Sequence, residues 1–162
     1  MKNYRGIIVC GARKTGKTTL IKEKLLKKYP GRKFIYDVNK EYPGGVMMDM
    51  DQFLNISTQL QNSIILFEEA TIFFDNKGSV KEVREMLVRA RHSNVILVFA
   101  FHALQFVPLN ILSMCDVLIL KRTNDNEGLI TKKFKDSPKI ITAFYALRRL
   151  PKYSHISIRL GV

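Results

Sequence analysis

Continuous apolar runs alternate along the chain with segments in which apolar residues recur at helical spacing. This alternation is typical of an α/β fold with a mostly parallel sheet, because each strand is followed by a helix that crosses back over the sheet. The apolar runs predict five strands, at residues 6–10, 33–37, 63–67, 95–101 and 117–120. A weaker alternation predicts an edge strand within residues 153–160.

The intervening segments predict helices at residues 18–28, 51–60, 80–91, 108–114 and 137–149. Ser79 and Glu82 form a capping-box pattern at the start of the third helix, and residues 75–78 are interpreted as a turn before it. Residues 123–136 have no predicted element and are long enough to form a lid.

The length of 162 residues suggests one domain, with a nucleotide-binding core at residues 6–120 and a basic extension at residues 121–162. The longest apolar run, residues 95–101, is too short to span a membrane, and residues 1–10 do not resemble a signal peptide. Cys10 and Cys115 lie in apolar runs, which predicts buried, reduced thiols and a cytoplasmic protein.

Residues 11–18 match the phosphate-loop pattern G-x-x-x-x-G-K-[ST] between a predicted strand and a predicted helix, the context that this motif requires. The glycines let successive backbone N–H groups turn toward phosphate oxygens. Lys17 is expected to reach the β- and γ-phosphates of ATP, and the Thr18 hydroxyl to bind Mg²⁺. We expect Lys17 to be solvated while the site is empty. The candidate nucleotide-binding residues are Gly11, Ala12, Arg13, Lys14, Thr15, Gly16, Lys17, Thr18 and Thr19.

The strand at residues 63–67 ends in two carboxylates, Glu68 and Glu69. In a phosphate-loop protein this strand end faces the phosphates, so one carboxylate can enter the Mg²⁺ shell and the other can activate water. We assign Glu68 to the metal and Glu69 to the water, although the two roles could be exchanged. Glutamate is longer than the usual aspartate, which favours contact with Mg²⁺ through water.

Three classes of nucleotide-dependent protein are alternatives for this loop. A GTPase is disfavoured, because residues 39–42 fail the N-K-x-D pattern at its last position and Asp75 follows the acidic strand end. A nucleotide or nucleoside kinase would use residues 123–136 as its lid, but the water-activating Glu69 favours hydrolysis. A nucleotide-dependent virion assembly factor that does not hydrolyse ATP is the third candidate.

Four features together resemble the FtsK–HerA superfamily of DNA-pumping ATPases, especially its short viral genome-packaging members. They are the phosphate loop, the D-V-N-K-E-Y stretch at residues 37–42, the E-E-A stretch at residues 68–70, and R-A-R-H-S-N at residues 89–94 before a strand that ends at His102. The sequence departs from the family pattern where Glu68 replaces an aspartate and His102 a glutamine. It also lacks the membrane segment of the related filamentous-phage assembly ATPases.

The resemblance implies a strand order of 5-1-4-3-2 and ATP hydrolysis coupled to movement of DNA into a capsid. It further implies a ring of five or six subunits, with a capsid or portal component as a possible partner, in the host cytoplasm or associated with the virion. Arg91 is the expected arginine acting on a neighbouring subunit's nucleotide, with Arg89 or Arg84 as alternatives. His102 is the expected γ-phosphate sensor, with Gln105 as the alternative.

The positive net charge suggests a negatively charged binding partner. The chain carries 27 Lys and Arg against 14 Asp and Glu, and the excess lies in residues 1–40 and 121–162. A dense negative partner such as double-stranded DNA would account for it, as would a merely solvated basic surface. The clusters at residues 132–135 and 148–152 are candidates to line a DNA channel. Since no base-reading motif is present, binding should be to phosphates.

Overall fold

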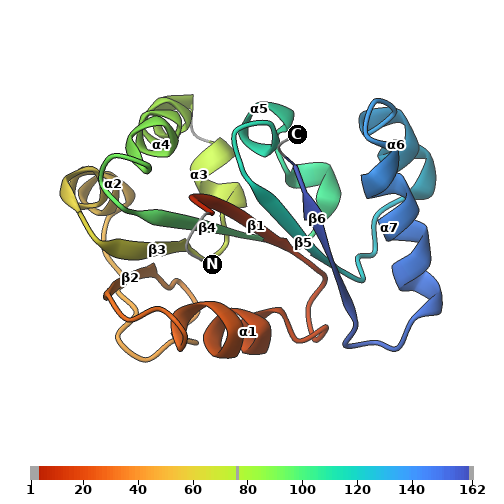
Figure 1. The fold of residues 1–162 in the computed structure, drawn as a ribbon, viewed down its shortest axis with the longest axis horizontal. Helices are drawn as coiled ribbons and strands as arrows, with labels where there is room; N and C mark the ends of the chain where they lie inside the picture. The colour runs from red at the N-terminus through yellow and green to blue at the C-terminus, as the bar shows by residue number, and fades with distance from the viewer. Residues whose placement is uncertain (1–3, 76, 161–162) are drawn as a thin grey trace.

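A computed structural model of the protein describes residues 4–75 and 77–160. Six strands form one sheet in the order β2-β3-β4-β1-β5-β6 (Figure 1). The strands are β1 (Gly6–Cys10), β2 (Arg32–Tyr36), β3 (Ser63–Phe67), β4 (Ile96–Phe101), β5 (Val117–Lys121) and β6 (His155–Arg159). The first five are parallel, and their order, read in reverse, is the predicted 5-1-4-3-2. The difference is β6, which extends the sheet beyond β5 as an antiparallel edge strand.

The continuous apolar runs of the sequence form the centre of this sheet. Every residue of β1, β3 and β4 is buried, because helices cover both faces of a parallel sheet. The edge strands β2 and β6 have mixed burial, which explains their weaker hydrophobic pattern. The predicted α/β domain with a mostly parallel sheet flanked by helices is therefore confirmed.

Each of the five predicted helices is present, and three short helical segments within the described residues are additional. The helices are α1 (Lys17–Leu20) continued by the π-helical η1 (Ile21–Leu26), α2 (Met50–Gln59), α3 (Thr71–Asp75), α4 (Lys77–Arg89), the 3-10 turn η2 (Leu104–Phe106), α5 (Leu109–Leu112), α6 (Glu127–Lys133) and α7 (Pro138–Arg149). The short helices α3 and α6 were not predicted, and the turn predicted at residues 75–78 is wrong for its described part. Asp75 ends α3, Lys77 begins α4, and Asn76 lies outside the described residues. α4 begins at Lys77, so Ser79 lies inside the helix and not at the predicted position before it.

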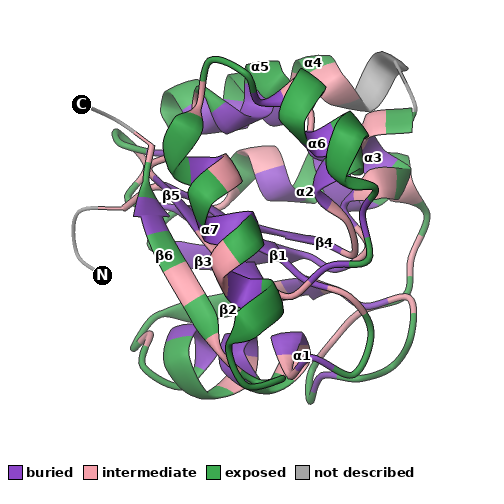
Figure 2. Ribbon diagram, turned by 90° about the vertical axis from the view of Figure 1, so that its right-hand side faces the viewer, coloured by how far each residue is buried: buried purple, intermediate pink, exposed green. Residues whose placement is uncertain are grey.

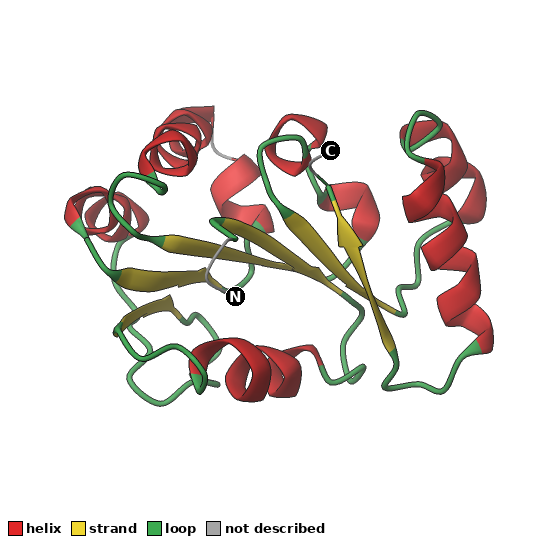
Figure 3. Ribbon diagram, viewed as in Figure 1, coloured by secondary structure: helices red, strands yellow, loops and turns green. Residues whose placement is uncertain are grey.

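Helices cover both faces of the sheet (Figure 3). The segment α1–η1 packs on one face through a cluster that includes Leu20, Ile21 and Leu25. The helices α2 to α7 belong to the larger cluster on the other face, which contains the stacked ring pair Phe67 and Phe99. Figure 2 shows the buried central strands between helices whose outer sides are exposed. The polar residues that follow the strands are consequently the groups of the sheet that can meet solvent and a ligand.

Residues 123–136 do not form an open lid. Within them α6 buries Ile130, and Phe134 is buried immediately after it, both in the main core. The buried carboxylate of Asp125 accepts hydrogen bonds from the backbone N–H groups of Leu104 and Gln105, at 2.8 and 3.0 Å. The lid interpretation is wrong because the segment is fixed to the domain by its apolar residues and by Asp125.

Cys10 and Cys115 are both buried and free, as predicted. Burial raises the pKa of the Cys115 thiol to about 12, so this group stays protonated and unreactive at neutral pH. Among the helices of residues 4–75 and 77–160, none combines the length and the apolar character needed to cross a bilayer.

Candidate functional site

The phosphate loop leaves the carboxyl end of β1 in a conformation that depends on its glycines. A methyl group at Gly11 would lie 2.7 Å from Cβ of Lys121 and 3.0 Å from the Thr15 hydroxyl, so no larger residue fits there. Gly16 has a φ of 80° and Lys14 a φ of 62°. Alternation between left-handed and ordinary backbone turns N–H groups inward, which is the geometry of an anion-binding nest.

Lys17 begins α1 directly after this loop, and it is only 5% exposed. Its Nζ lies 3.4 Å from Oε1 of Glu68 and 3.3 Å from Nδ1 of His102. The expectation that Lys17 is solvated in an empty site is therefore wrong. The ends of β3 and β4 bring these polar groups to the lysine, which fixes its position.

Parallel register explains why residues so distant in sequence meet here. Phe67 of β3 pairs with Phe99 of β4, and Phe101 of β4 pairs with Cys10 of β1. The residues that follow these strands therefore emerge at one edge of the sheet. Glu68 is 2% exposed there and accepts a hydrogen bond from the Tyr42 hydroxyl at Oε2, at 2.8 Å. Burial raises the pKa of Glu68, while the charge of Lys17 acts in the opposite direction.

Glu69 occupies a different environment from its neighbour. Its φ of 56° is unusual for a residue with a side chain, and such strained backbone is concentrated at functional sites. Its Oε1 lies 2.5 Å from Nε2 of His102 and 3.2 Å from Nδ2 of Asn39. The hydrogen bond from His102 is the main cause of a lowered pKa for Glu69, which keeps this carboxylate ionised.

The contacts of His102 favour one tautomer of its ring. The Lys17 ammonium has only hydrogens to offer, so Nδ1 accepts and the ring proton of a neutral imidazole resides on Nε2. That proton is donated to Glu69. His102 thus connects the lysine of the phosphate loop to the second carboxylate. Gln105, the alternative sensor, is exposed on η2 and does not line this cavity.

The loop after β2 supplies functional groups that the sequence analysis did not assign. The buried carboxylate of Asp37 accepts hydrogen bonds from the backbone N–H groups of Glu41 and Tyr42, at 3.0 and 2.7 Å. This folds the loop so that Oε2 of Glu41 accepts a hydrogen bond from the Thr18 hydroxyl at 2.7 Å. The available signal was a run of polar residues directly after a parallel strand, at the edge where the other strand ends were expected.

These side chains surround a cavity of about 480 Å³ at the phosphate loop. It is lined by Ala12, Arg13, Lys14, Gly16, Lys17, Thr18, Thr19, Asn39, Glu41, Glu68, Glu69 and His102. Most of the predicted nucleotide residues are therefore brought together, with Gly11 and Thr15 behind the lining. Thr15 is buried and donates from its hydroxyl to the carbonyl of Ala12 at 2.7 Å, so it shapes the loop from within.

The donor set fits Mg²⁺ only as a partly protein-bound ion. Within the described ranges, no three His, Cys, Asp or Glu residues are grouped so that they could hold a metal. Mg²⁺ generally takes one or two protein ligands and completes its shell with water and substrate phosphates. The adjacent oxygens of Thr18 and Glu41 suit that role. Both oxygens of Glu68 are already engaged, which fits contact through water better than direct ligation.

Two of the predicted trans-acting arginines, Arg89 and Arg91, lie at the opposite end of the sheet, where its parallel strands begin. Arg89 ends α4, and Arg91 is 78% exposed with its guanidinium 3.8 Å from Asp116, just before β5. Asp116 also accepts from the backbone of residues 5 and 6 at the start of β1. The five residues of β1 separate this end from the phosphate loop by about 16 Å. Both arginines are therefore remote from the phosphate loop of their own chain.

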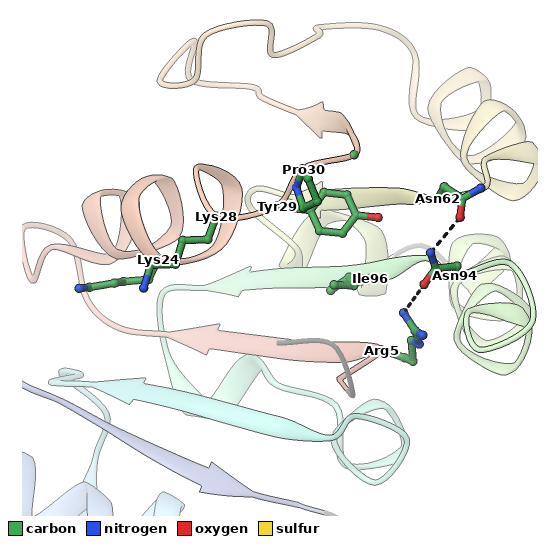
Figure 4. Close-up of a pocket in the computed structure, with 9 residues that line it drawn as sticks. Arg5, Lys24, Lys28, Tyr29, Pro30, Asn62, Asn94 and Ile96 are labelled. Atoms are coloured by element: carbon green, nitrogen blue, oxygen red, sulfur yellow. Dashed lines mark hydrogen bonds between the residues drawn. The ribbon is translucent and has the colours of Figure 1, made fainter.

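A cavity of about 900 Å³ lies at this amino-terminal end (Figure 4). Arg5 donates to Asn94 at 3.0 Å, and Asn94 donates to Asn62 at 2.8 Å, along one side of it. Lys24 and Lys28 of the α1–η1 side add positive charge. Its lining contains neither a carboxylate nor a phosphate-loop residue, so this larger cavity is not the candidate catalytic site.

Comparison with solved structures identifies proteins of the same fold. The genome-packaging NTPase B204 from Sulfolobus turreted icosahedral virus 2, solved with AMPPCP, superposes with a TM-score of 0.76 at 17% identity, covering 99% of this chain and 94% of that one. The same protein with ATP-gammaS gives 0.71 at 19% identity, with coverages of 96% and 92%. The DNA-packaging ATPase B204 from Sulfolobus Turreted Icosahedral Virus gives 0.72 at 17% identity, with coverages of 96% and 92%.

No protein-family model matches the sequence, and no curated protein matches it. The likeness of fold extends over nearly the whole of both chains. The resemblance to the short viral genome-packaging ATPases, drawn from four motifs, is thus confirmed in the architecture.

Proposed function

We propose that this protein hydrolyses ATP to move double-stranded DNA, as the motor of viral genome packaging. The observation that carries the proposal is the meeting of Lys17, Glu68, Glu69 and His102 at the mouth of a phosphate loop. The fold shared with B204, a protein described as a genome-packaging NTPase, supports the same function. The fixed position of residues 123–136 argues against the kinase alternative, which requires a mobile lid.

In this function the chain's own residues divide the chemistry of the β–γ phosphoanhydride. The N–H groups of the phosphate loop and Lys17 bind the triphosphate. Glu69 orients a water molecule and accepts its proton as the oxygen bonds to the γ-phosphorus and the bond to the bridging oxygen breaks. Thr18 and Glu41 would hold Mg²⁺, with Glu68 behind them, and the ion would neutralise phosphate charge.

Duplex DNA is expected to raise the rate of phosphate release and to bind with a strong salt dependence. Each phosphate neutralised should contribute about 0.9 to the slope of log affinity against log salt concentration. Filter binding across a salt series, together with a phosphate-release assay, would measure both effects. Hydrolysis indifferent to DNA would contradict the motor. Phosphate transferred to an acceptor nucleotide would favour the kinase, and ring formation without hydrolysis the assembly factor.

Only part of the basic clusters is available to contact DNA in this proposal. Lys133 donates to the carbonyl of Gln105 at 2.6 Å, and Arg148 contacts both Glu127 and the carbonyl of Asp125. These two residues connect α6 and α7 to their surroundings. The exposed cations that remain in the two clusters are Lys132, Lys135, Arg149 and Lys152.

A ring would complete the site with an arginine from the adjacent subunit. A planar guanidinium suits the charge that develops on a γ-phosphate, and a head-to-tail interface can close into a ring. Arg91 is exposed at the end of the sheet opposite its own phosphate loop, which supports a role toward another chain. Arg89 is the second candidate at the same end.

Arg91→Ala should bind ATP normally, hydrolyse it poorly, and recover activity when mixed with Glu69→Gln. In a mixed ring some interfaces combine an intact Glu69 from one subunit with an intact Arg91 from its neighbour. Steady-state phosphate release of the mixture, compared with each inactive variant alone, measures the recovery. If mixed rings form and their activity does not exceed that of the separate variants, the trans role of Arg91 is wrong.

A further inference from the structure

Lys121 fixes the turn between α7 and β6 against the phosphate loop. It ends β5 and is only 2% exposed, and its side chain passes Gly11 and Gly16. Its Nζ donates to the carbonyl of Tyr153 at 2.8 Å, and the turn is closed by a hydrogen bond from the Ser154 N–H to the carbonyl of Pro151 at 3.0 Å. Figure 1 shows this turn beside the loop that connects β1 to α1.

The ring of Tyr153 is held at the loop but is not buried. A methyl group at Gly16 would lie 3.3 Å from Cδ1 of Tyr153, yet this tyrosine is 67% exposed. Its ring therefore borders the phosphate loop without filling a core position. Lys152 Nζ lies over one face of the ring, 5.7 Å from its centroid. This contact leaves the second face of the ring for a ligand.

Sheet order determines which end of a bound triphosphate would face Tyr153. Glu68, Glu69 and His102 follow β3 and β4, on one side of β1, and they define where the γ-phosphate reacts. Tyr153 precedes β6, on the other side of β1. A triphosphate whose γ end points toward β3 and β4 must direct its nucleoside end toward β5 and β6.

The geometry points to Tyr153 as the platform on which the base of the bound nucleotide stacks. This inference rests on the proposed function, since it requires the triphosphate to occupy the loop. The cavity at the loop is lined largely by polar and charged side chains, which suit phosphates and not a flat heterocycle. An exposed aromatic ring next to Gly16 supplies the apolar surface that a base needs. Because every base has a π-face, such a platform favours nucleotides over bare triphosphate without selecting among bases.

The test compares ATP with inorganic tripolyphosphate, both with Mg²⁺, by titration calorimetry. Tyr153→Ala should weaken ATP binding roughly tenfold, the typical cost of losing one base–aromatic stack, and should leave tripolyphosphate binding unchanged. Tyr153→Phe keeps the ring and should bind ATP like the wild type. Tyr145→Ala, which removes an exposed tyrosine of α7, serves as the matched control.

A second readout is tyrosine fluorescence at saturating ligand, where the signal no longer depends on affinity. The chain has six tyrosines and no tryptophan, so its emission is that of tyrosine. ATP should quench this emission and tripolyphosphate should not, and Tyr153→Ala should lose most of the quenching. Unchanged ATP affinity in Tyr153→Ala would overturn the platform, as would an equal loss for tripolyphosphate, which would indicate a damaged loop. Failure of the wild type to bind either ligand would instead overturn the proposed function.

Discussion

Glu69→Gln should bind ATP like the wild type and hydrolyse it at least about 100-fold more slowly, which is the typical contribution of a positioned general base. Glutamine preserves the shape of the side chain and its contacts with Asn39 and His102, but its amide cannot accept the proton of the attacking water. Both described contacts of the carboxylate fall on Oε1, so within the described part of the chain Oε2 is left to face a water molecule.

Single-turnover hydrolysis and ATP binding, measured on the same preparation, separate these two effects. Glu68→Gln is the matched control, because Glu68 is buried with its two oxygens engaged by Lys17 and Tyr42. It should change stability and metal dependence more than the chemical step. Should Glu68→Gln lose the chemical step while Glu69→Gln remains nearly active, the two roles are exchanged.

Lys17→Ala should abolish ATP binding and also destabilise the empty protein by about 3 to 5 kcal/mol, the usual cost of removing one partner of a buried ion pair. Glu68 would then remain buried without its cation, although it could take up a proton. Burial already raises the pKa of Glu68, and losing Lys17 removes the main opposing effect. The deficit in unfolding free energy should therefore shrink as the pH falls and Glu68 becomes neutral.

A double variant separates binding from folding in this experiment. Lys17→Ala combined with Glu68→Gln leaves no buried charge in the pair, so it should recover much of the stability and still fail to bind. Denaturant unfolding gives the stability, and the thermal shift with Mg-ATP gives the binding. A shift that persists in either variant would contradict the assignment of the phosphate loop.

Local signals account for the parts of the site that the sequence predicted. The strand Gly6–Cys10, the loop that follows it and the strand Ser63–Phe67 with its two carboxylates depend on continuous apolar runs and on fixed spacing. These patterns act within a few residues, because a buried strand needs apolar side chains throughout and a phosphate nest needs consecutive N–H groups. His102 was expected from the resemblance, as the polar residue that follows a buried strand.

Weak local patterns explain the helices that were missed. The five residues of α3 and the seven of α6 are too short to display helical periodicity, and their formation depends on packing, through Phe73 in α3 and Ile130 in α6. The weak alternation of residues 153–160 predicted an edge strand, but the antiparallel pairing of β6 with β5 was visible only in the tertiary structure.

By itself the sequence determined the parallel α/β architecture, the phosphate loop and the acidic strand end, since each follows from neighbouring residues. Only the tertiary structure decided that Lys17 is buried between Glu68 and His102, that Glu41 reaches Thr18, and that Tyr153 borders Gly16. These contacts join residues separated by 23 to 137 positions, and they exist because parallel register and sheet order bring distant strand ends and the turn before β6 to one edge. Hydrophobic burial sets that register, and it leaves the polar residues beyond each strand to meet in the site.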